Sequence, residues 1–466
     1  MKKTNIENID RTIYDIIDNV DIKEKAPKGL NEEIIKRISE IKKEPEWMKN
    51  IRLSAYKKFL ESKNPNWGPD LTEVDLSKIS TYISPNAKKK ASWEDVPEEI
   101  KNTFDRLGIV DAEKKYLAGV SAQFDSEEIY HNVKSHLKDL GVIYMDLSEA
   151  VLKHEKLVKK YFSKLIDENL HKYAALHLAV WSGGSFVYVP KGVKLDIPIQ
   201  SYYRLNAPGA GQFEHTLIVV EEDSSLHFIE GCSAPQYNEL NIHAGSVEIF
   251  VGKNAKMKFS TIENWSKNMY NLNTKKAEVL EGGSIDWVSG SFGSKVSMLY
   301  PTTILKEENA SMTYTGITFA SSGQEIDNGS GTIHLAPNTY SNINTKSICK
   351  GNGKSITRNH IYIAKDAKNS VSNSDCSNLM LDKESISYTI PVFNVNTKDA
   401  EVVHEATTGK ISENKIFYLM SRGLSEEEAK QQIIKGFAEP ISNLLPIEYA
   451  VEMNNLIGLE LEGTNG

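Results

Sequence analysis

The segments EEDSSLHFI (residues 221–229) and GKNAKMKFS (residues 252–260) share one plan, in which polar residues and a small residue precede alternating side chains. The plan returns in PKGVKLDIP (190–198), EGGSIDWVS (281–289), EENASMTYT (307–315), APNTYSNIN (336–344), AKDAKNSVS (364–372) and TKDAEVVHE (397–405). Aligned on their small positions, at residues 193, 224, 255, 284, 310, 339, 367 and 400, the segments recur every 26 to 33 residues. A unit of this length, built from strands and tight turns, predicts a β-solenoid in which each strand pairs with equivalent strands of neighbouring coils.

The predicted fold is therefore mainly β, with a parallel β-helix core over residues 176–405. An N-terminal, mostly helical domain is expected over residues 1–170, because residues 31–62 place apolar side chains on one helical stripe. The segments DSEEIYHNVKSHLKDL (125–140) and SEAVLKHEKLVKKYFSKLI (148–166) indicate further helices, since each opens on Ser or Asp before an acidic first turn.

Residues 406–466 are expected to form a C-terminal helical region. Gly423 is placed to end one helix, and Ser425 with Glu428 makes a capping-box pattern that opens the next. The apolar faces must pack against something, and they cover the open end of the solenoid or bind another chain. Their residues are Ile416, Phe417, Leu419, Ile433, Ile434 and Phe437.

Composition excludes several classes of protein. The 466 residues carry a formal net charge of -8, which argues against a nucleic-acid surface. Uninterrupted apolar spans of about 18 residues are absent, so no transmembrane helix is expected. The first 20 residues lack the apolar block of a signal peptide, and a cytoplasmic location is expected.

Three cysteines occur, Cys232, Cys349 and Cys376, and none forms a CxxC pair. A cytoplasmic chain with so few cysteines is not expected to depend on disulfides. Cys232 and Cys376 lie among turn-forming residues, where a thiol is accessible to an electrophile. For Cys232 a buried, inert thiol is an equal alternative, and Cys349 alternates as a buried strand residue does.

The fourth residue after the small position predicts one inward column, formed by Phe228, Phe259, Tyr314, Val371 and His404. Adjacent strand residues point to opposite faces, so His404 is expected to face inward and Glu405 outward. Either His404 is a hydrogen-bonded core residue, or it is a ligand at the uncovered end of the last coil.

The usual signatures of catalysis are missing: Walker A, an opening Rossmann glycine pattern, HExxH and GxSxG do not occur. Many β-solenoids act on polysaccharides, and Arg204, Glu263 and Asp286 are the residues that would serve there. A carbohydrate-active enzyme is nevertheless a distant alternative for a cytoplasmic chain.

Five ordered segments carry a resemblance to a known family. They are LHFIEGCSAP (226–235), FSTIENW (259–265), SDCSNLMLD (374–382), VVHEATTGKI (402–411) and YLMSRGLSEEEAKQQIIKGF (418–437). Together they resemble the SufB family, the scaffold subunits of the SUF system for iron-sulfur cluster assembly. The resemblance extends through essentially the whole chain.

The resemblance implies a non-enzymatic scaffold that accepts persulfide sulfur and iron and passes a nascent cluster to acceptor proteins. It matches Cys232 with the sulfur-accepting cysteine, and Cys376 and Glu405 with residues that hold iron and the transient cluster, with His404 beside them. A sulfur path is matched at Arg204, Asn206, Trp265 and either Lys275 or Lys276. Glu263 stands on this path where many relatives have Gln.

The resemblance also implies partners. A SufC-type ABC ATPase is expected to bind the C-terminal helical region and to carry the ATPase activity. A SufD-type paralogue, or a second copy of this chain, is expected to bind the β-helix. A cysteine desulfurase system would deliver sulfur. Reduced flavin in the complex follows from family analogy alone, since no motif here supports it. A purely structural, SufD-like role is the alternative, and the presence of both Cys232 and Cys376 argues against it.

Two further expectations come from spacing. Cys232 and Glu263 each lie eight residues after their small positions, which predicts that they are stacked neighbours. Cys376 and Glu405 lie nine and five residues after theirs, which predicts that they lie in different columns. Iron-sulfur clusters are usually held by four thiolates. Three cysteines cannot supply four, so His, Glu or a partner chain must contribute.

Overall fold

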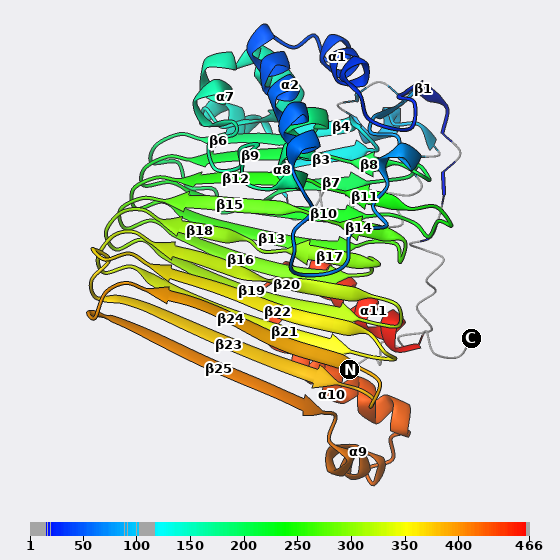
Figure 1. Ribbon diagram of the computed structural model, residues 1–466, viewed down its shortest axis with the longest axis vertical. Coiled ribbons are helices and arrows are strands. Elements are labelled where there is room, and N and C mark those ends of the chain that lie inside the picture. The colour runs from blue at the N-terminus through cyan, green and yellow to red at the C-terminus, as the bar shows by residue number, and fades with distance from the viewer. Residues whose placement is uncertain are drawn as a thin grey trace.

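Each coil of the chain contributes strands to two facing parallel sheets, stacked along one long axis (Figure 1). The computed structural model describes residues 15, 17–18, 20–87, 89–90, 92–98, 100–101 and 117–462, so the predicted domain of residues 1–170 lies partly outside the described residues. The protein is mainly β, and its solenoid has about 8 turns, which confirms the predicted fold class.

The first sheet has ten strands among the described residues, and all but the last pair in its order are parallel. In spatial order they are β25 (Ala400–Lys410), β23 (Ser370–Met380), β21 (Tyr340–Cys349), β19 (Ser311–Ala320), β16 (Ser284–Phe292), β13 (Lys256–Asn264), β10 (Ser225–Ser233), β7 (Ile199–Arg204), β3 (Gly119–Phe124) and β4 (Glu127–Val133).

The second sheet is split in its early coils and continuous in its late ones. One branch holds β5 (Ile143–Asp146), β6 (Ser185–Val189), β9 (His215–Val220), β12 (Ser246–Val251), β15 (Thr274–Val279) and β18 (Thr302–Leu305). The other holds β8 (Gly211–Gln212), β11 (Asn241–His243), β14 (Met269–Asn271) and β17 (Val296–Leu299). The long strand β20 (Glu325–His334) pairs with both β17 and β18, and β22 (Lys354–Ile363) and β24 (Ile386–Val395) continue from it.

The register confirms most of the predicted coil alignment and corrects it at two coils. Ala255 aligns with Gly283 rather than Ser284, because Lys256 pairs with Ser284. Thr339 aligns with Ser370 rather than Ala367, because a longer turn through Asn369, with φ 55°, precedes β23. The inward column therefore contains Trp287, Ile343 and Ser374, and Val371 is not part of it.

The helix predicted for residues 125–140 is wrong over its first half. Residues Glu127–Val133 form β4, which pairs antiparallel with β3, and only the short helix α5 (Ser135–Asp139) follows. β3 is itself paired with β7 of the solenoid, so tertiary pairing of this hairpin overrides the local helical pattern. Strands β3 to β6 extend both sheets ahead of residue 190.

Helices from the N-terminal part cover the outer face of the second sheet along its early coils (Figure 1). These are α1 (Glu32–Ile41), α2 (Glu46–Glu61), α6 (Leu147–Lys153), α7 (Glu155–Tyr161) and α8 (Lys172–Val180), and the short strands β1 (Ile22–Lys25) and β2 (Ile83–Pro85) form a separate antiparallel pair. Ile35 and Ile38 of α1 belong to the same apolar cluster as Phe186 and Leu217 of the sheet. The Arg52 guanidinium of α2 bonds the buried Glu44 carboxylate at 2.6 Å and the Trp181 carbonyl at 2.9 Å.

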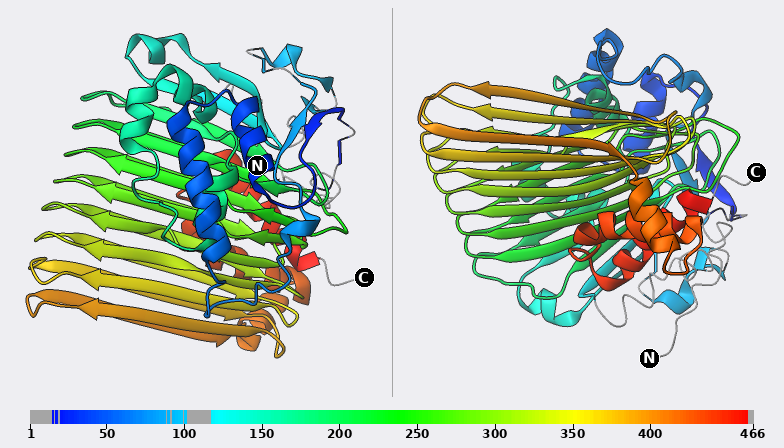
Figure 2. Two further views of the ribbon diagram at one scale, coloured as in Figure 1. Left: turned by 45° about the horizontal axis from the view of Figure 1, so that its top comes forward. Right: turned by 90° about the horizontal axis from the view of Figure 1, so that it is seen from below.

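The C-terminal helices are α9 (Glu413–Met420), α10 (Glu426–Ser442) and α11 (Ile447–Glu462). The predicted capping box of Ser425 and Glu428 is confirmed. α10 and α11 pack on the outer face of the first sheet, where Ile434 and Met453 join Ile229 and Ile262 in one cluster (Figure 2). The helices thus cover a sheet face, and the end strands β24 and β25 are paired on one side only in the described structure. None of the helices described combines the length and apolar character of a membrane span.

Substitutions at two glycines test how closely the coils approach one another. A Cβ on Gly329 would lie 1.8 Å from the Arg358 carbonyl oxygen of the next strand, whereas a Cβ on Gly436 in α10 meets nothing within 4 Å. Gly329→Ala should lower the free energy of unfolding by about 3 kcal/mol through overpacking. Gly436→Ala should raise it by about 0.5–1 kcal/mol. Urea denaturation measures both, and a Gly329→Ala protein as stable as wild type would contradict this strand geometry.

Candidate functional site

The interior of the solenoid is divided along its length into an apolar half and a polar half. Phe228, Phe259, Trp287 and Tyr314 stack in the apolar half and face Ile249, Ala277 and Leu305 of the second sheet. The polar half begins two residues further along each strand of the first sheet. It is formed by two neighbouring columns of inward side chains.

Strand pairing defines both columns. The first polar column is Ser201, Glu230, Thr261, Ser289, Gly316, Thr345, Cys376 and Ala406. The second polar column is Tyr203, Cys232, Glu263, Ser291, Thr318, Ser347, Asn378 and Thr408. The predicted stacking of Cys232 on Glu263 is confirmed. Cys232 and Cys376 therefore face the same interior from neighbouring columns.

Cys232 lies inside the protein, with 1% of its surface exposed. Its strand continues to Ser233, so the expectation of an accessible turn thiol is wrong and the buried alternative holds. Burial and the carboxylates of Glu230, Glu214 and Glu263 raise the pKa of the Cys232 thiol well above its ordinary value. At rest the sulfur is therefore a neutral thiol, shielded from water.

A buried cation crosses the interior beside Cys232. Lys275 extends inward from β15 of the second sheet, and its Nζ donates to the Glu230 carboxylate and lies 3.9 Å from Glu263 Oε1. Burial raises the pKa of the Glu230 carboxyl group. Attraction to the Lys275 ammonium group opposes this rise. Lys276 is half-buried on the other face, so Lys275 is the lysine that faces the interior.

A chain of hydrogen bonds leads away from Glu263. Asn271 Nδ2 donates to Glu263 Oε2 at 2.7 Å, its Oδ1 lies 2.7 Å from His243 Nδ1, and His243 Nε2 lies 2.5 Å from Glu214 Oε1. Burial lowers the pKa of His243, but the Glu214 and Glu263 carboxylates and the hydrogen bond to Asn271 together outweigh it, and the net shift is upward. A protonated His243 donates to both partners. The Trp265 ring lies 4.5 Å from the His243 ring, which places Trp265 at this site.

Sequence reasoning missed Glu214, Glu230, His243 and Asn271. Glu230 was detectable, because it lies two residues before Cys232 and so shares the face of one strand. His243 and Asn271 end the short strands β11 and β14, and Glu214 lies in the link between β8 and β9, where the sequence carries no recurring pattern. Only the fold brings them to Cys232.

Arg204 and Asn206 are buried at the edge of the coil, outside the two columns. Arg204 Nη1 donates to Ser233 Oγ at 3.0 Å, beside Cys232 in the chain. The Asn206 carboxamide accepts from the Asp18 amide at 3.0 Å and donates to the Asp18 carbonyl at 2.9 Å, and so binds the N-terminal segment. The structure thus brings Trp265, Glu263 and Lys275 around Cys232. Arg204 and Asn206 lie at the edge of this group.

Cys376 lies in the middle of β23, fully buried, so its expected position in a turn is wrong. Asn359 of β22 reaches across from the second sheet and donates through Nδ2 to Cys376 Sγ at 3.3 Å and to Ser374 Oγ at 3.0 Å. Burial raises the pKa of the Cys376 thiol. Cys349, predicted to be buried, ends β21, and its Sγ donates to the Ile386 carbonyl at 3.5 Å.

The last strand separates His404 from Glu405. His404 pairs with Ser374 and faces inward, with its ring 5.5 Å from Phe393, and its Nδ1 has no hydrogen-bond partner in the described structure. Glu405 pairs with Asp375 and is exposed on the outer face. His404, and not Glu405, therefore shares the inner face with Cys376. When the coil is counted from Ser370, Cys376 pairs with Ala406, the residue after Glu405. Cys376 and Glu405 therefore lie in different columns, as predicted, but they are closer in register than predicted.

Distance limits what the two cysteines can do together. Five strand spacings separate β10 from β23, and at about 4.8 Å each they amount to roughly 24 Å. The described residues include no group of three or more His, Cys, Asp or Glu side chains placed to hold a metal ion. His404 lies on the last strand of the first sheet, and Cys376 lies buried on the strand before it.

Apolar side chains are exposed at the end of the solenoid and on α9. Tyr388 (54%) and Val403 (47%) lie on the outer faces of the second and the first sheet, and α9 exposes Phe417 (73%) and Tyr418 (57%). Exposed apolar patches are candidate interaction sites.

The buried charges predict that replacing Lys275 destabilises the protein to an extent that depends on pH. Lys275→Met leaves Glu230 without its ammonium and should lower the free energy of unfolding by about 3–5 kcal/mol. The loss should be smaller at pH 5 than at pH 8, because a raised carboxyl pKa costs stability only as pH rises above about 4.3. Denaturant titrations at both pH values measure it.

The matched control is Lys306→Met, which removes a half-exposed lysine paired with Glu278 at 2.9 Å. It should cost about 0–1 kcal/mol at either pH. Equal losses in the two variants would show that Lys275 is not the buried counter-ion described here.

Comparisons with known proteins match the whole described solenoid. The SufBD core domain of the SUF system for iron-sulfur cluster assembly matches residues 203–437, and the SufBD protein N-terminal region matches residues 30–201. An iron-sulfur cluster assembly SufBD family protein of Staphylococcus saprophyticus is 48% identical over 442 residues, 95% of each chain. Its counterpart in Staphylococcus aureus strain MRSA252 is 49% identical over 442 residues, again 95% of each chain.

Proposed function

This chain belongs to the SufBD family of iron-sulfur cluster assembly proteins, and we propose that within it the chain acts as a cytoplasmic scaffold of SufB type. The scaffold accepts sulfur at Cys232, builds a transient cluster at Cys376 and passes it on. One observation carries the proposal: both cysteines face the polar half of one enclosed interior.

Cys232 suits the storage of sulfane sulfur. Its side chain is buried, so a persulfide there is protected from water and from other thiols. The Lys275 ammonium offsets part of the negative field of Glu230 and Glu263. In this proposal a cysteine desulfurase system delivers the sulfur, and the coil edge at Ser233 and Arg204 opens to admit it.

Sulfur must then travel, because roughly 24 Å is too far for direct attack of one cysteine on the persulfide of the other. Two electrons and one proton convert the Cys232 persulfide, R–S–SH, into the thiol R–SH and hydrosulfide, HS⁻. Reduced flavin is the class of reductant that the family suggests. Hydroxyl groups of the two polar columns, including Thr261, Ser289 and Thr345, line the way to Cys376.

Iron is proposed to meet this sulfide at the open end. Cys376 and His404 supply two ligands from the inner face, and a chain docked on β24 and β25 supplies the others. Glu405 reaches the same iron only when the end strand turns away from β23. A site with so few ligands of its own binds the cluster as cargo, which suits release to an acceptor.

The end of the solenoid and α9 fit the expected partners. We place a SufD-type paralogue, or a second copy of this chain, on the edges of β24 and β25 that are unpaired in the described structure, with Tyr388 and Val403 on the two sides of this end. A SufC-type ABC ATPase is placed on α9 at Phe417 and Tyr418. In this assignment ATP hydrolysis belongs to the partner, and this chain is a scaffold and not an enzyme.

Cysteine variants test the roles within the co-expressed complex. Incubation with desulfurase and cysteine should add 32 Da to a Cys232 peptide by mass spectrometry, and Cys232→Ser should abolish the adduct. Cys376→Ser should retain the adduct yet lose most of the thiolate-to-iron absorption after anaerobic reconstitution. Cys349→Ser, the third buried cysteine, is the control and should behave as wild type. A complex that takes no sulfur at Cys232 and reconstitutes equally well without Cys376 would refute the scaffold role and leave the structural, SufD-like one.

A docking variant tests the ATPase surface. Phe417→Asp places a charge in the exposed aromatic patch of α9 and should weaken capture of a SufC-type ATPase by about tenfold or more. Leu60→Asp, on a leucine of α2 that is 63% exposed, is the control and should leave capture unchanged. Pull-down and surface plasmon resonance measure both. Undiminished capture by Phe417→Asp would move the docking site elsewhere.

A further inference from the structure

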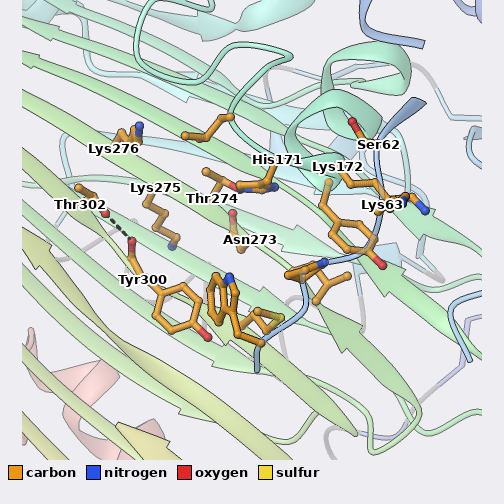
Figure 3. A pocket seen from close by; sticks show the side chains of 16 residues that line it. Ser62, Lys63, His171, Lys172, Asn273, Thr274, Lys275, Lys276, Tyr300 and Thr302 are labelled. Carbon is orange, nitrogen blue, oxygen red and sulfur yellow. Dashed lines mark hydrogen bonds between the residues drawn. The ribbon is translucent and has the colours of Figure 1, made fainter. Parts of the chain in front are cut away.

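A pocket of about 500 Å³ opens on the outer side of the second sheet, and Lys275, whose ammonium group reaches Glu230 in the interior, is one of its lining residues. The segment that follows α2, the start of α8 and the edges of β14, β15 and β17 surround it (Figure 3). Its volume is that of a small-molecule site. Apart from Lys275, its lining residues take no part in the proposed cysteine chemistry or in the docking surfaces.

The strongest sign of a ligand is Asn273, which lines the pocket and is 5% exposed. Neither its Oδ1 nor its Nδ2 has a hydrogen-bond partner in the described structure. A buried amide without partners is unfavourable by itself, so such a group indicates a missing partner. A carboxamide pairs best with a group that offers an acceptor and a donor side by side, as a nucleobase edge does.

The charge around the pocket is positive. Lys63, Lys172 and Lys276 line it, and none of the three forms an ion pair within 4.0 Å in the described part of the chain. His171 adds no charge, because burial and the nearby Lys276 lower its pKa to about 4, and both its ring nitrogens are bonded, to Ala174 and Thr274. The Glu248 carboxylate near Lys276 already accepts from the amides of residues 163, 165 and 166. The lysines are therefore available to an anion.

Aromatic rings form the remaining wall. The rings of Trp67 and Tyr300 are 5.8 Å apart, and the Arg358 guanidinium lies over Trp67 at 4.8 Å. Tyr173 and Met298 complete the lining. The Trp67 and Tyr300 rings are inclined at 55° to one another and offer an apolar wall against which a planar ring can pack, which an inorganic anion would not use.

We propose that this pocket binds a nucleotide, with its base against Trp67 and Tyr300, its base edge on Asn273 and its phosphate among Lys63, Lys172 and Lys276. The planar ring accounts for the aromatic wall, the paired donor and acceptor account for Asn273, and the phosphate accounts for the lysines. The proposal does not depend on the roles of Cys232 and Cys376.

Isothermal titration calorimetry of the full chain with AMP, GMP and UMP tests the proposal. At least one should bind with a Kd below about 1 mM, while adenosine and ribose 5-phosphate should each bind about tenfold more weakly than AMP, or not at all. Binding of none of the three nucleotides would overturn the proposal. Equal binding of ribose 5-phosphate would overturn it as well, since the pocket would then be a plain anion site.

Variants assign the binding to this pocket. Asn273→Ala removes a group that has no partner, so thermal stability should be unchanged or raised, while nucleotide affinity should fall about tenfold. Lys63→Ala should weaken nucleotide binding and leave adenosine binding unchanged. Lys365→Ala removes an exposed lysine from a distant turn and should change neither affinity. Full nucleotide affinity in Asn273→Ala and Lys63→Ala would show that the nucleotide binds elsewhere.

Discussion

Hydrogen-bonded pairing of equivalent strands in successive coils is the constraint on which the rest of this protein depends. Because each residue of one coil lies against a fixed residue of the next, every inward position becomes a column along the whole solenoid. Alternation then sorts the side chains strictly into inner and outer faces. The position of any chemical group follows from its column and coil. A shift of one residue, as between Ala406 and Glu405, moves a group to the other side of a sheet.

The polar half of the interior depends on the apolar half for its stability. Buried charges such as Glu230 and Lys275 contribute little net stability even when paired. The stacked aromatic rings beside them, and the helices packed on both outer faces, supply burial of apolar area. This division lets one solenoid hold ionisable groups and a thiol away from water. The environment in which we propose chemistry at Cys232 therefore depends on the apolar half.

The chain's own helices cover much of the outer face of the first sheet and the early coils of the second, while the last coil is uncovered in the part of the chain described. Cys376 and His404 lie just inside this uncovered end, and the exposed side chains of β24 and β25 lie around them. Under the proposed function, an incomplete site at this end would link formation of the cluster to docking of a partner, which would supply the ligands that three cysteines cannot.

The sequence by itself determined the β-solenoid, most of its coil register, the stacking of Cys232 on Glu263 and the inward direction of His404. These follow from period and alternation, which are local properties. Only the tertiary structure decided that β4 is a strand, that Cys232 and Cys376 are buried and that Lys275 faces Glu230. It also brought Glu214, His243 and Asn271 to the site. Those features arise from pairing and from contacts between opposite sheets, and residues that meet across the interior carry no shared pattern along the chain.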